Sequence, residues 1–316
     1  IGPTQLEIQA GARLNAITAK GVNTSGFSTV EPRFNVKYDI IKKKKGLRNL
    51  SVRGGWGVTY KMPSMAYLFP EDAYTDLVSF SYNDIDANNY GLAVITTRKT
   101  ETANSLLKPQ KSVNFEAGID IDGEIVGGSV VFFKERMTDG YGFVTEYLPL
   151  QYRRYGYKWV NGELAQDEIA SGAFPEYKNG RITAGGKTIS SISDTTFFSY
   201  YKPVNSITNN KWGIEYTLDF ARIEAINTTI NISGAYMNIH SSRGENTASH
   251  YSGTTGGRSF PYVGIYAGSA SSSNSSIRER LSTNVRFITH IPNIAIVVTL
   301  TAQMVFMDRT TNLYEH

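Results

Sequence analysis

The stretch QLEIQAGARLN, Gln5–Asn15, sorts its residues strictly by parity. Even positions hold Leu6, Ile8, Ala10, Ala12 and Leu14, and odd positions hold Gln5, Glu7, Gln9, Gly11, Arg13 and Asn15. Successive side chains of a β-strand point to opposite faces of the sheet. One face of this segment is therefore wholly apolar and the other polar, which suits either a soluble sandwich or a membrane barrel.

The same parity recurs along the chain. It appears in EPRFNVKYDI (31–40), LSVRGGWGVTY (50–60), KSVNFEAGIDI (111–121) and KWGIEYTLDF (211–220), more weakly in INTTINISGAY (226–236), and strand-like segments follow at 124–136, 277–289 and 294–306. These are about nine strands, most of them roughly 10 to 13 residues long, whereas strands of soluble proteins average about 5 to 6 and tilted membrane strands need about 9 to 11. Strand length favours a membrane protein.

The connections between these strands alternate in length. Long ones span residues 16–30, 61–110, 137–210 and 239–276, and short ones span 41–46, 122–123, 221–225 and 290–293. Tight turns at one rim and long loops at the other are typical of outer-membrane barrels. We therefore expect an all-β, antiparallel transmembrane barrel fragment, with the apolar parity facing lipid and the polar parity facing a wet lumen.

Composition excludes several classes of function. The 32 Lys and Arg against 28 Asp and Glu leave a net charge of only +4, too small to indicate a nucleic-acid partner. There is no cysteine, so thiolate metal sites and cysteine nucleophiles are excluded. The four histidines show no metal-ligand spacing and no catalytic motif is present, so we predict no catalytic residue, metal or cofactor. Because the chain starts at Ile1 and a strand-like segment runs almost to its end, we expect a piece of a longer barrel.

Two motifs carry a resemblance to a family. SVRGGWGVTYKMPSMAYLFP (51–70) resembles the barrel segment of TonB-dependent outer-membrane receptors, in which an Arg- and Gly-containing strand runs into a Pro-Ser loop start. LKPQKSVNFEAGIDI (107–121) is similar to the family's Leu-x-Pro-Glu strand opening followed by Ser and a Glu-x-Gly pair, here Leu107, Pro109, Gln110, Ser112, Glu116 and Gly118. Gln110 departs from the usual acidic residue.

The resemblance implies a non-enzymatic nutrient importer in the outer membrane of a Gram-negative bacterium. Residues 1–316 would be part of a 22-stranded barrel, with the plug domain, the TonB box and the remaining strands outside this chain. Its partners would be outer-membrane lipid, an extracellular nutrient and the TonB complex, reached through the absent N-terminal region. Long aromatic loops and tight turns favour the SusC-like branch, whose members import glycans or peptides under a SusD-like surface lipoprotein.

Aromatic residues in two long connections are the candidate ligand contacts. Aromatic faces stack on sugar rings or bases, and Arg hydrogen-bonds to oxygens. The connection 137–210 contains YLPLQYRRYGYKW (147–159), and 61–110 could form a second wall. From these we select Tyr67, Tyr82, Tyr152, Arg153, Tyr155, Tyr157 and Trp159 as external ligand-binding residues. The competing interpretation is that these loops pack on their own aromatic residues.

Two other function classes remain open from the sequence. A barrel protease or phospholipase would need His with Ser, Asp or Glu at a strand end, and His240 and His250 are the candidates in a long connection. A soluble, carbohydrate-binding β protein would need a second sheet to cover the apolar parity. DIDGE (120–124) has the start of a calcium-loop spacing, but Asp-Gly is a favoured hairpin pair, so we expect a hairpin there.

Overall fold

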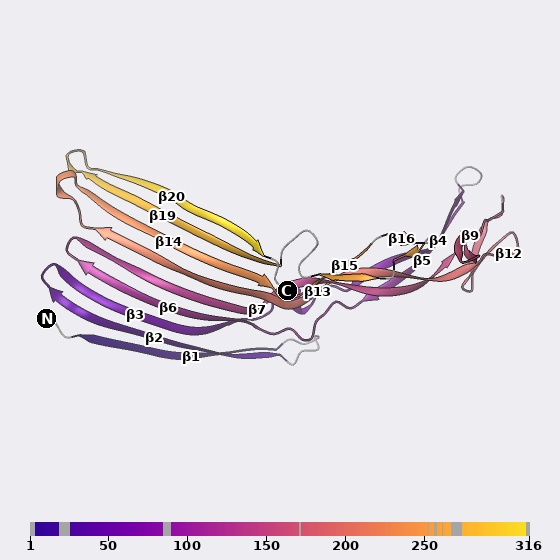
Figure 1. Ribbon diagram of the computed structural model, residues 1–316, viewed down its shortest axis with the longest axis horizontal. Helices are drawn as coiled ribbons and strands as arrows, with labels where there is room; N and C mark the ends of the chain where they lie inside the picture. The colour runs from indigo at the N-terminus through magenta and orange to yellow at the C-terminus, as the bar shows by residue number, and fades with distance from the viewer. Residues whose placement is uncertain are drawn as a thin grey trace.

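The computed structural model describes residues 4–18, 26–84, 90–170, 172–251, 253–255, 258–260, 262–266 and 274–313. Its main body is one nine-stranded antiparallel sheet whose strands are neighbours in chain order (Figure 1). They are β1 (Gln5–Ile17), β2 (Phe27–Lys44), β3 (Leu47–Lys61), β6 (Gln110–Gly123), β7 (Val126–Tyr155), β13 (Ser191–Phe220), β14 (Thr228–Arg243), β19 (Ser275–Ile291) and β20 (Ile296–Leu313). The nine long strands predicted from parity are confirmed.

Tight turns join the strands at one end of this sheet. Gly46 closes the β2–β3 turn with φ +82°, a left-handed conformation that glycine adopts without strain. The 3₁₀ turns η1 (Glu224–Ile226) and η2 (Pro292–Ile294) connect β13 to β14 and β19 to β20. The DIDGE stretch is also a hairpin, with β6 paired to β7 from Asp122 and Gly127 outward. These turns lie together at the end of the sheet farthest from the long connections (Figure 1).

The apolar parity of the sheet is exposed. Leu6 is 58% exposed, Val130 47% and Leu300 63%, and large hydrophobic residues of the same parity are exposed on most of the nine strands. A soluble β-sandwich buries such a face under a second sheet, but here the face lies open. A face of this kind is suited to lipid, which argues against the soluble alternative. No helix among the described residues is long and apolar enough to cross a membrane.

The opposite face carries charged residues in cross-strand ion pairs. Arg53 lies 3.2 Å from Asp120, between β3 and β6, and Lys211 lies 3.1 Å from Glu135, between β13 and β7. Arg278 lies 3.0 Å from Asp308, between β19 and β20. These side chains are partly exposed, so the polar parity forms a hydrated surface, as the lumen of a membrane barrel does.

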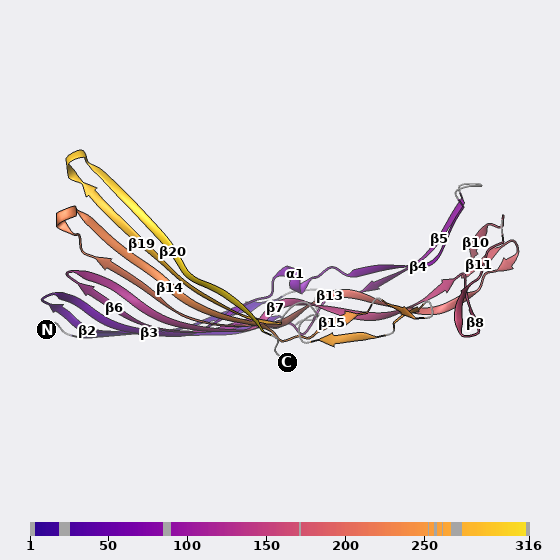
Figure 2. The same cartoon turned by 45° about the horizontal axis from the view of Figure 1, so that its top comes forward.

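The connection 137–210 differs from the prediction, because most of it is strand. β7 and β13 are each 30 residues long and remain paired as a ribbon far beyond the sheet (Figure 2). Two register shifts, between Asn205 and Ile207 and between Ile207 and Asn209, mark where the ribbon leaves the sheet. Asp139, opposite them, has φ +57°. Turn-forming residues therefore mark a β-bulge here, which bends the ladder without ending it.

The other long connections are also partly ordered. Residues 61–110 contain α1 (Met65–Leu68) and a hairpin of β4 (Ala73–Asp84) and β5 (Tyr90–Thr100). Residues 239–276 contain β15 (Thr247–His250), β16 (Thr254–Thr255), β17 (Arg258–Ser259) and β18 (Val263–Tyr266). The connection predicted at 16–30 is shorter than expected, since β1 reaches Ile17 and β2 starts at Phe27, and its residues 19–25 lie outside the described residues.

Small strands complete the far end of the ribbon. They are β8 (Tyr157–Val160), β9 (Glu163–Gln166), β10 (Pro175–Lys178), β11 (Arg181–Ala184) and β12 (Lys187–Thr188). We call residues 141–205 together with the β4–β5 hairpin the arm. The arm extends to the side of the sheet opposite the tight turns (Figures 1 and 2).

Candidate functional site

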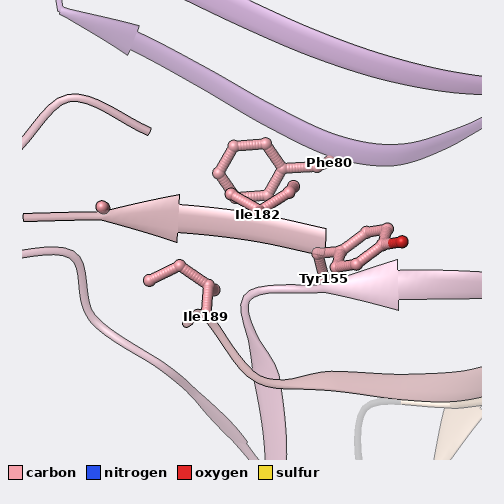
Figure 3. Packing of buried hydrophobic residues seen from close by; sticks show 5 residues of the cluster. Phe80, Tyr155, Ile182 and Ile189 are labelled. Carbon is pink, nitrogen blue, oxygen red and sulfur yellow. The ribbon is translucent and has the colours of Figure 1, made fainter. Parts of the chain in front are cut away.

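The outer end of the arm has its own small hydrophobic core. Phe80 of β4, Tyr155 of β7, Ile182 and Ala184 of β11, and Ile189 pack together, each 7% exposed or less (Figure 3). The Tyr155 hydroxyl donates a hydrogen bond of 2.7 Å to the carbonyl oxygen of Gly180. This core fixes the β4–β5 hairpin against the ribbon, although the two segments are separated by about 70 residues in the sequence.

A pocket of about 520 Å³ opens beside this core. Its walls come from β4, from the end of β7 and the start of β8, and from the end of β9 and the residues after it. They include Phe80, Tyr82, Arg154, Tyr155, Tyr157, Gln166, Asp167 and Glu168. Pockets for small ligands typically measure about 300 to 1,000 Å³ and combine aromatic walls with a few polar groups. This pocket has that size and that composition.

Arg154 is held in place at the wall of the pocket. Its guanidinium carbon lies 3.8 Å from the centre of the Tyr157 ring, in a cation–π contact. The same guanidinium lies 3.4 Å from Asp194 on β13. Because Arg154 is stacked on one residue and paired with another, its remaining N–H donors are oriented before any ligand arrives.

Asp167 is the most strongly fixed acid of the pocket. Its side chain is 4% exposed, accepts a 2.9 Å hydrogen bond from the Ser190 backbone N–H, and lies 3.2 Å from Lys158 and 3.7 Å from Lys187. The Ser190 hydrogen bonds, followed by that of Lys158, hold the pKa of Asp167 well below its usual range. Asp167 is therefore ionised at neutral pH and ties the ends of three segments together.

The predicted ligand residues fall into two groups. Tyr82, Tyr155 and Tyr157 line the pocket, and Tyr155 is also part of the core. The other predicted residues, Tyr67, Tyr152, Arg153 and Trp159, do not line it.

Each residue of the second group has its own environment. Tyr67 stacks on Phe143 at 5.1 Å, where the ribbon leaves the sheet. Tyr152 is half-buried, and burial raises its pKa. Arg153 is exposed, and Trp159 on β8 is 46% exposed. Tyr67 lies in α1, outside the arm, and the other three are spread along the arm, so the four do not form one cluster with the pocket.

Sequence reasoning missed Asp167, Gln166 and Glu168 as pocket residues. They lie in a stretch with no strand periodicity, and the partners of Asp167 lie 9 to 23 residues away in the chain. The local signal is the run of polar residues that starts at the last position of β9. Nothing in that run indicates that it would face Tyr82.

The two histidines proposed for the enzyme alternative occupy structural positions. His240 Nε2 lies 2.8 Å from Ser275 Oγ, but Ser275 is 3% exposed, which keeps its hydroxyl away from any substrate. His250 packs 5.0 Å from the Phe197 ring and 2.9 Å from the carbonyl oxygen of Phe260, which anchors β15 on the ribbon. Within the described ranges, no three His, Asp or Glu side chains are placed to hold a metal ion.

Comparison with known families decides the class. A family model described as "TonB dependent receptor-like, beta-barrel" matches residues 1–162, just over half of the chain. The chain belongs to this family. Searches of curated proteins and of solved structures gave no match.

Family membership places this TonB-dependent receptor barrel in the outer membrane of Gram-negative bacteria, in a family of transporters that bind a ligand and act with TonB. The exposed apolar face of the sheet is accordingly its lipid face. The arm, which continues from the long-connection rim, is on the extracellular side in barrels of this kind. The family is one of transporters and not of enzymes.

Proposed function

We propose that this barrel belongs to an importer of a bulky hydrophilic nutrient, a glycan or a peptide, of the SusC-like branch, and that the arm pocket makes the first contact with the ligand. The observation that carries the proposal is the pocket itself, which joins Tyr82 to Tyr157 and Arg154 across segments far apart in the sequence. Aromatic faces bind the apolar faces of sugar rings, and Arg donates to hydroxyl or carbonyl oxygens.

The remainder of the transport apparatus is part of the same proposal. A plug domain, a TonB box and further strands completing a 22-stranded barrel would belong to the same protein outside residues 1–316. A SusD-like surface lipoprotein would cover the ligand on the extracellular side. Exposed aromatic residues of the arm support a partner there, since Tyr74 is 64% exposed, Tyr201 69% and Trp159 46%, and aromatic residues are enriched at protein interfaces.

The test uses the complete receptor, purified in detergent and titrated by calorimetry with a panel of linear oligosaccharides and a panel of peptides. We expect binding from one panel. Tyr157→Ala removes both an aromatic wall and the surface on which Arg154 stacks, so it should weaken that binding about tenfold. Tyr201→Ala, which removes an exposed aromatic residue elsewhere on the arm, is the matched control.

Two results would count against this proposal. If neither panel binds, the ligand class is wrong. If Tyr157→Ala binds as tightly as the wild type, the ligand does not use this pocket. Growth on the same nutrient, measured for cells with and without TonB, separates a wrong pocket from a wrong function.

A further inference from the structure

Three cations lie on the lipid face of the sheet. Lys134 on β7 is directly opposite Phe115 on β6 and Trp212 on β13. Residues directly opposite one another on antiparallel strands share a face, and Phe115 and Trp212 are exposed on the lipid face. Arg136, two residues further along β7, is on the same face. So is Lys111, because it pairs with Thr138, two residues beyond Arg136.

These cations lie at the upper edge of the apolar band. Lys134 is eight residues and Arg136 ten residues beyond Val126, where β7 begins at the tight-turn rim. At about 3.4 Å per residue and a tilt of about 45°, they are about 19 and 24 Å above that rim, and Lys111 is higher still. The apolar band of an outer-membrane barrel is about 25 Å tall. Lys134 is therefore just below the top of the apolar band, Arg136 is at its edge and Lys111 is above it, and the long side chains of the lower two can reach the level of the lipid headgroups.

Across the described ranges, none of these three cations has an acidic partner. Cations on the polar face differ in this respect, since Arg53, Lys211 and Arg278 each pair with a carboxylate. None of the three is directly opposite another, but Lys134 and Arg136 are two residues apart and Lys111 is diagonal to Arg136, so their like charges repel. An external anion among three such charges offsets their repulsion, and Asn210, directly opposite Arg136, adds an amide donor.

An apolar pocket adjoins the cations. Its volume is about 860 Å³, and its walls include Leu14, Val30, Tyr60, Lys108 and Lys111. Leu14 is 79% exposed and Val30 53%. Asp139 also lines this pocket, and its carboxylate accepts a 3.3 Å hydrogen bond from Thr138. A surface with an apolar groove on one side and free cations on the other matches a molecule with a hydrocarbon chain and an anionic head.

We propose that this surface, formed by Lys111, Lys134, Arg136 and the adjoining Leu14–Val30 pocket, binds a phosphate-bearing lipid of the outer leaflet. The phosphate lies among the three cations, where Arg136 can donate two parallel hydrogen bonds to it. An acyl chain lies along Leu14 and Val30. The bound lipid stabilises the barrel just below the point where β7 and β13 leave the sheet as the arm.

The test measures lipid binding to the complete receptor in a non-ionic detergent by native mass spectrometry. The probes are lipid A carrying two phosphates, the same lipid with both phosphates removed, and inorganic phosphate alone. The test variant is Lys111→Gln with Lys134→Gln and Arg136→Gln. The matched control removes three exposed cations from the arm, Arg98→Gln with Lys178→Gln and Arg181→Gln.

We expect phosphorylated lipid A to bind more tightly than the dephosphorylated form. Each cation removed should weaken binding about fivefold, and the control should bind as the wild type does. Lys111→Arg with Lys134→Arg keeps both charges and should retain binding, which separates a lost charge from a misfolded barrel. Equal binding by the test variant and the wild type overturns the proposal, as does an equal loss in the control. Displacement of the lipid by inorganic phosphate alone would show a site for free phosphate instead.

Discussion

The small core of the arm predicts a local loss of stability when Ile182 is truncated. Ile182 is 0% exposed and lies between Phe80 and Ile189 (Figure 3). Ile182→Ala removes buried methyl groups and leaves a cavity, which costs about 2–5 kcal/mol. Among the residues that the structure describes, five buried ones form this core, so we expect the loss to open the arm end, while β19 and β20, which contribute no residue to the core, stay paired.

The assay is hydrogen exchange measured by mass spectrometry on the complete receptor in detergent. Because a tenfold change corresponds to about 1.4 kcal/mol, exchange in β10, β11 and the outer end of β7 should accelerate by at least about 30-fold. Peptides from β19 and β20 should be unchanged. Ile95→Ala, at a 52% exposed position on β5, is the control and should alter exchange little. Unchanged exchange at the arm end in Ile182→Ala, or equal acceleration in β19, would refute the reasoning.

Three further changes test other features of the structure. Asp167→Asn should lower the stability of the arm by about 1.5 kcal/mol or more, because the charge that Ser190 and Lys158 contact is removed. Since the pKa of Asp167 is depressed in the folded protein, its contribution to the stability of the arm is present above about pH 4 and is lost as the pH falls toward the folded pKa. Limited proteolysis of the wild type should therefore quicken below pH 4, and that of the variant should not. Burial, and then the hydrogen bond to Glu146, raise the pKa of Tyr200 to about 12. The contribution of Tyr200 to stability is therefore complete below about pH 10 and is lost as the pH rises through about 12. The difference in tyrosinate absorbance between wild type and Tyr200→Phe should show that late transition. Val130→Arg lies on the lipid face, four residues above the tight-turn rim, and should make the free energy of folding into lipid vesicles less favourable by about 2–4 kcal/mol. Tyr201→Arg on the arm should leave that free energy unchanged. Equal effects of the two substitutions would mean that this face does not meet lipid.

The sheet was predictable because parity acts at every position. In the segment 50–60, predicted from alternation alone, the structure has β3 at Leu47–Lys61 with Trp56 exposed on the apolar side. A one-residue slip would reverse all of these faces, so a chain with one lipid face and one wet face specifies its register strongly. The tight turns were predictable for a related reason, because Gly46 and the Asp-Gly pair have local turn chemistry.

The arm was not predictable from the same signals. Thr138-Asp139-Gly140 and Asn209-Asn210 contain residues that favour turns, and a sequence alone does not distinguish a turn from a bulge. The ladder between β7 and β13 decides which one forms, and that pairing joins residues up to about 90 positions apart. The pocket depends on a further long-range contact, between β4 and the end of β7. Tyr82 and Tyr157 are aromatic candidates by residue type alone, and the wall that they share follows only from tertiary packing.

The arm can hold a pocket only if it is rigid, and a two-stranded ribbon alone is marginally stable in water. Two additions provide the rigidity. The Phe80–Ile182 core fixes the outer end, and His250 of β15 packs on Phe197 part-way along the ribbon. Binding costs less when the site is ordered beforehand, so residues that never touch a ligand determine how well Arg154 and Tyr157 bind one. The stability of the core and the affinity of the pocket are therefore coupled, and Ile182→Ala should weaken ligand binding even though Ile182 does not line the pocket.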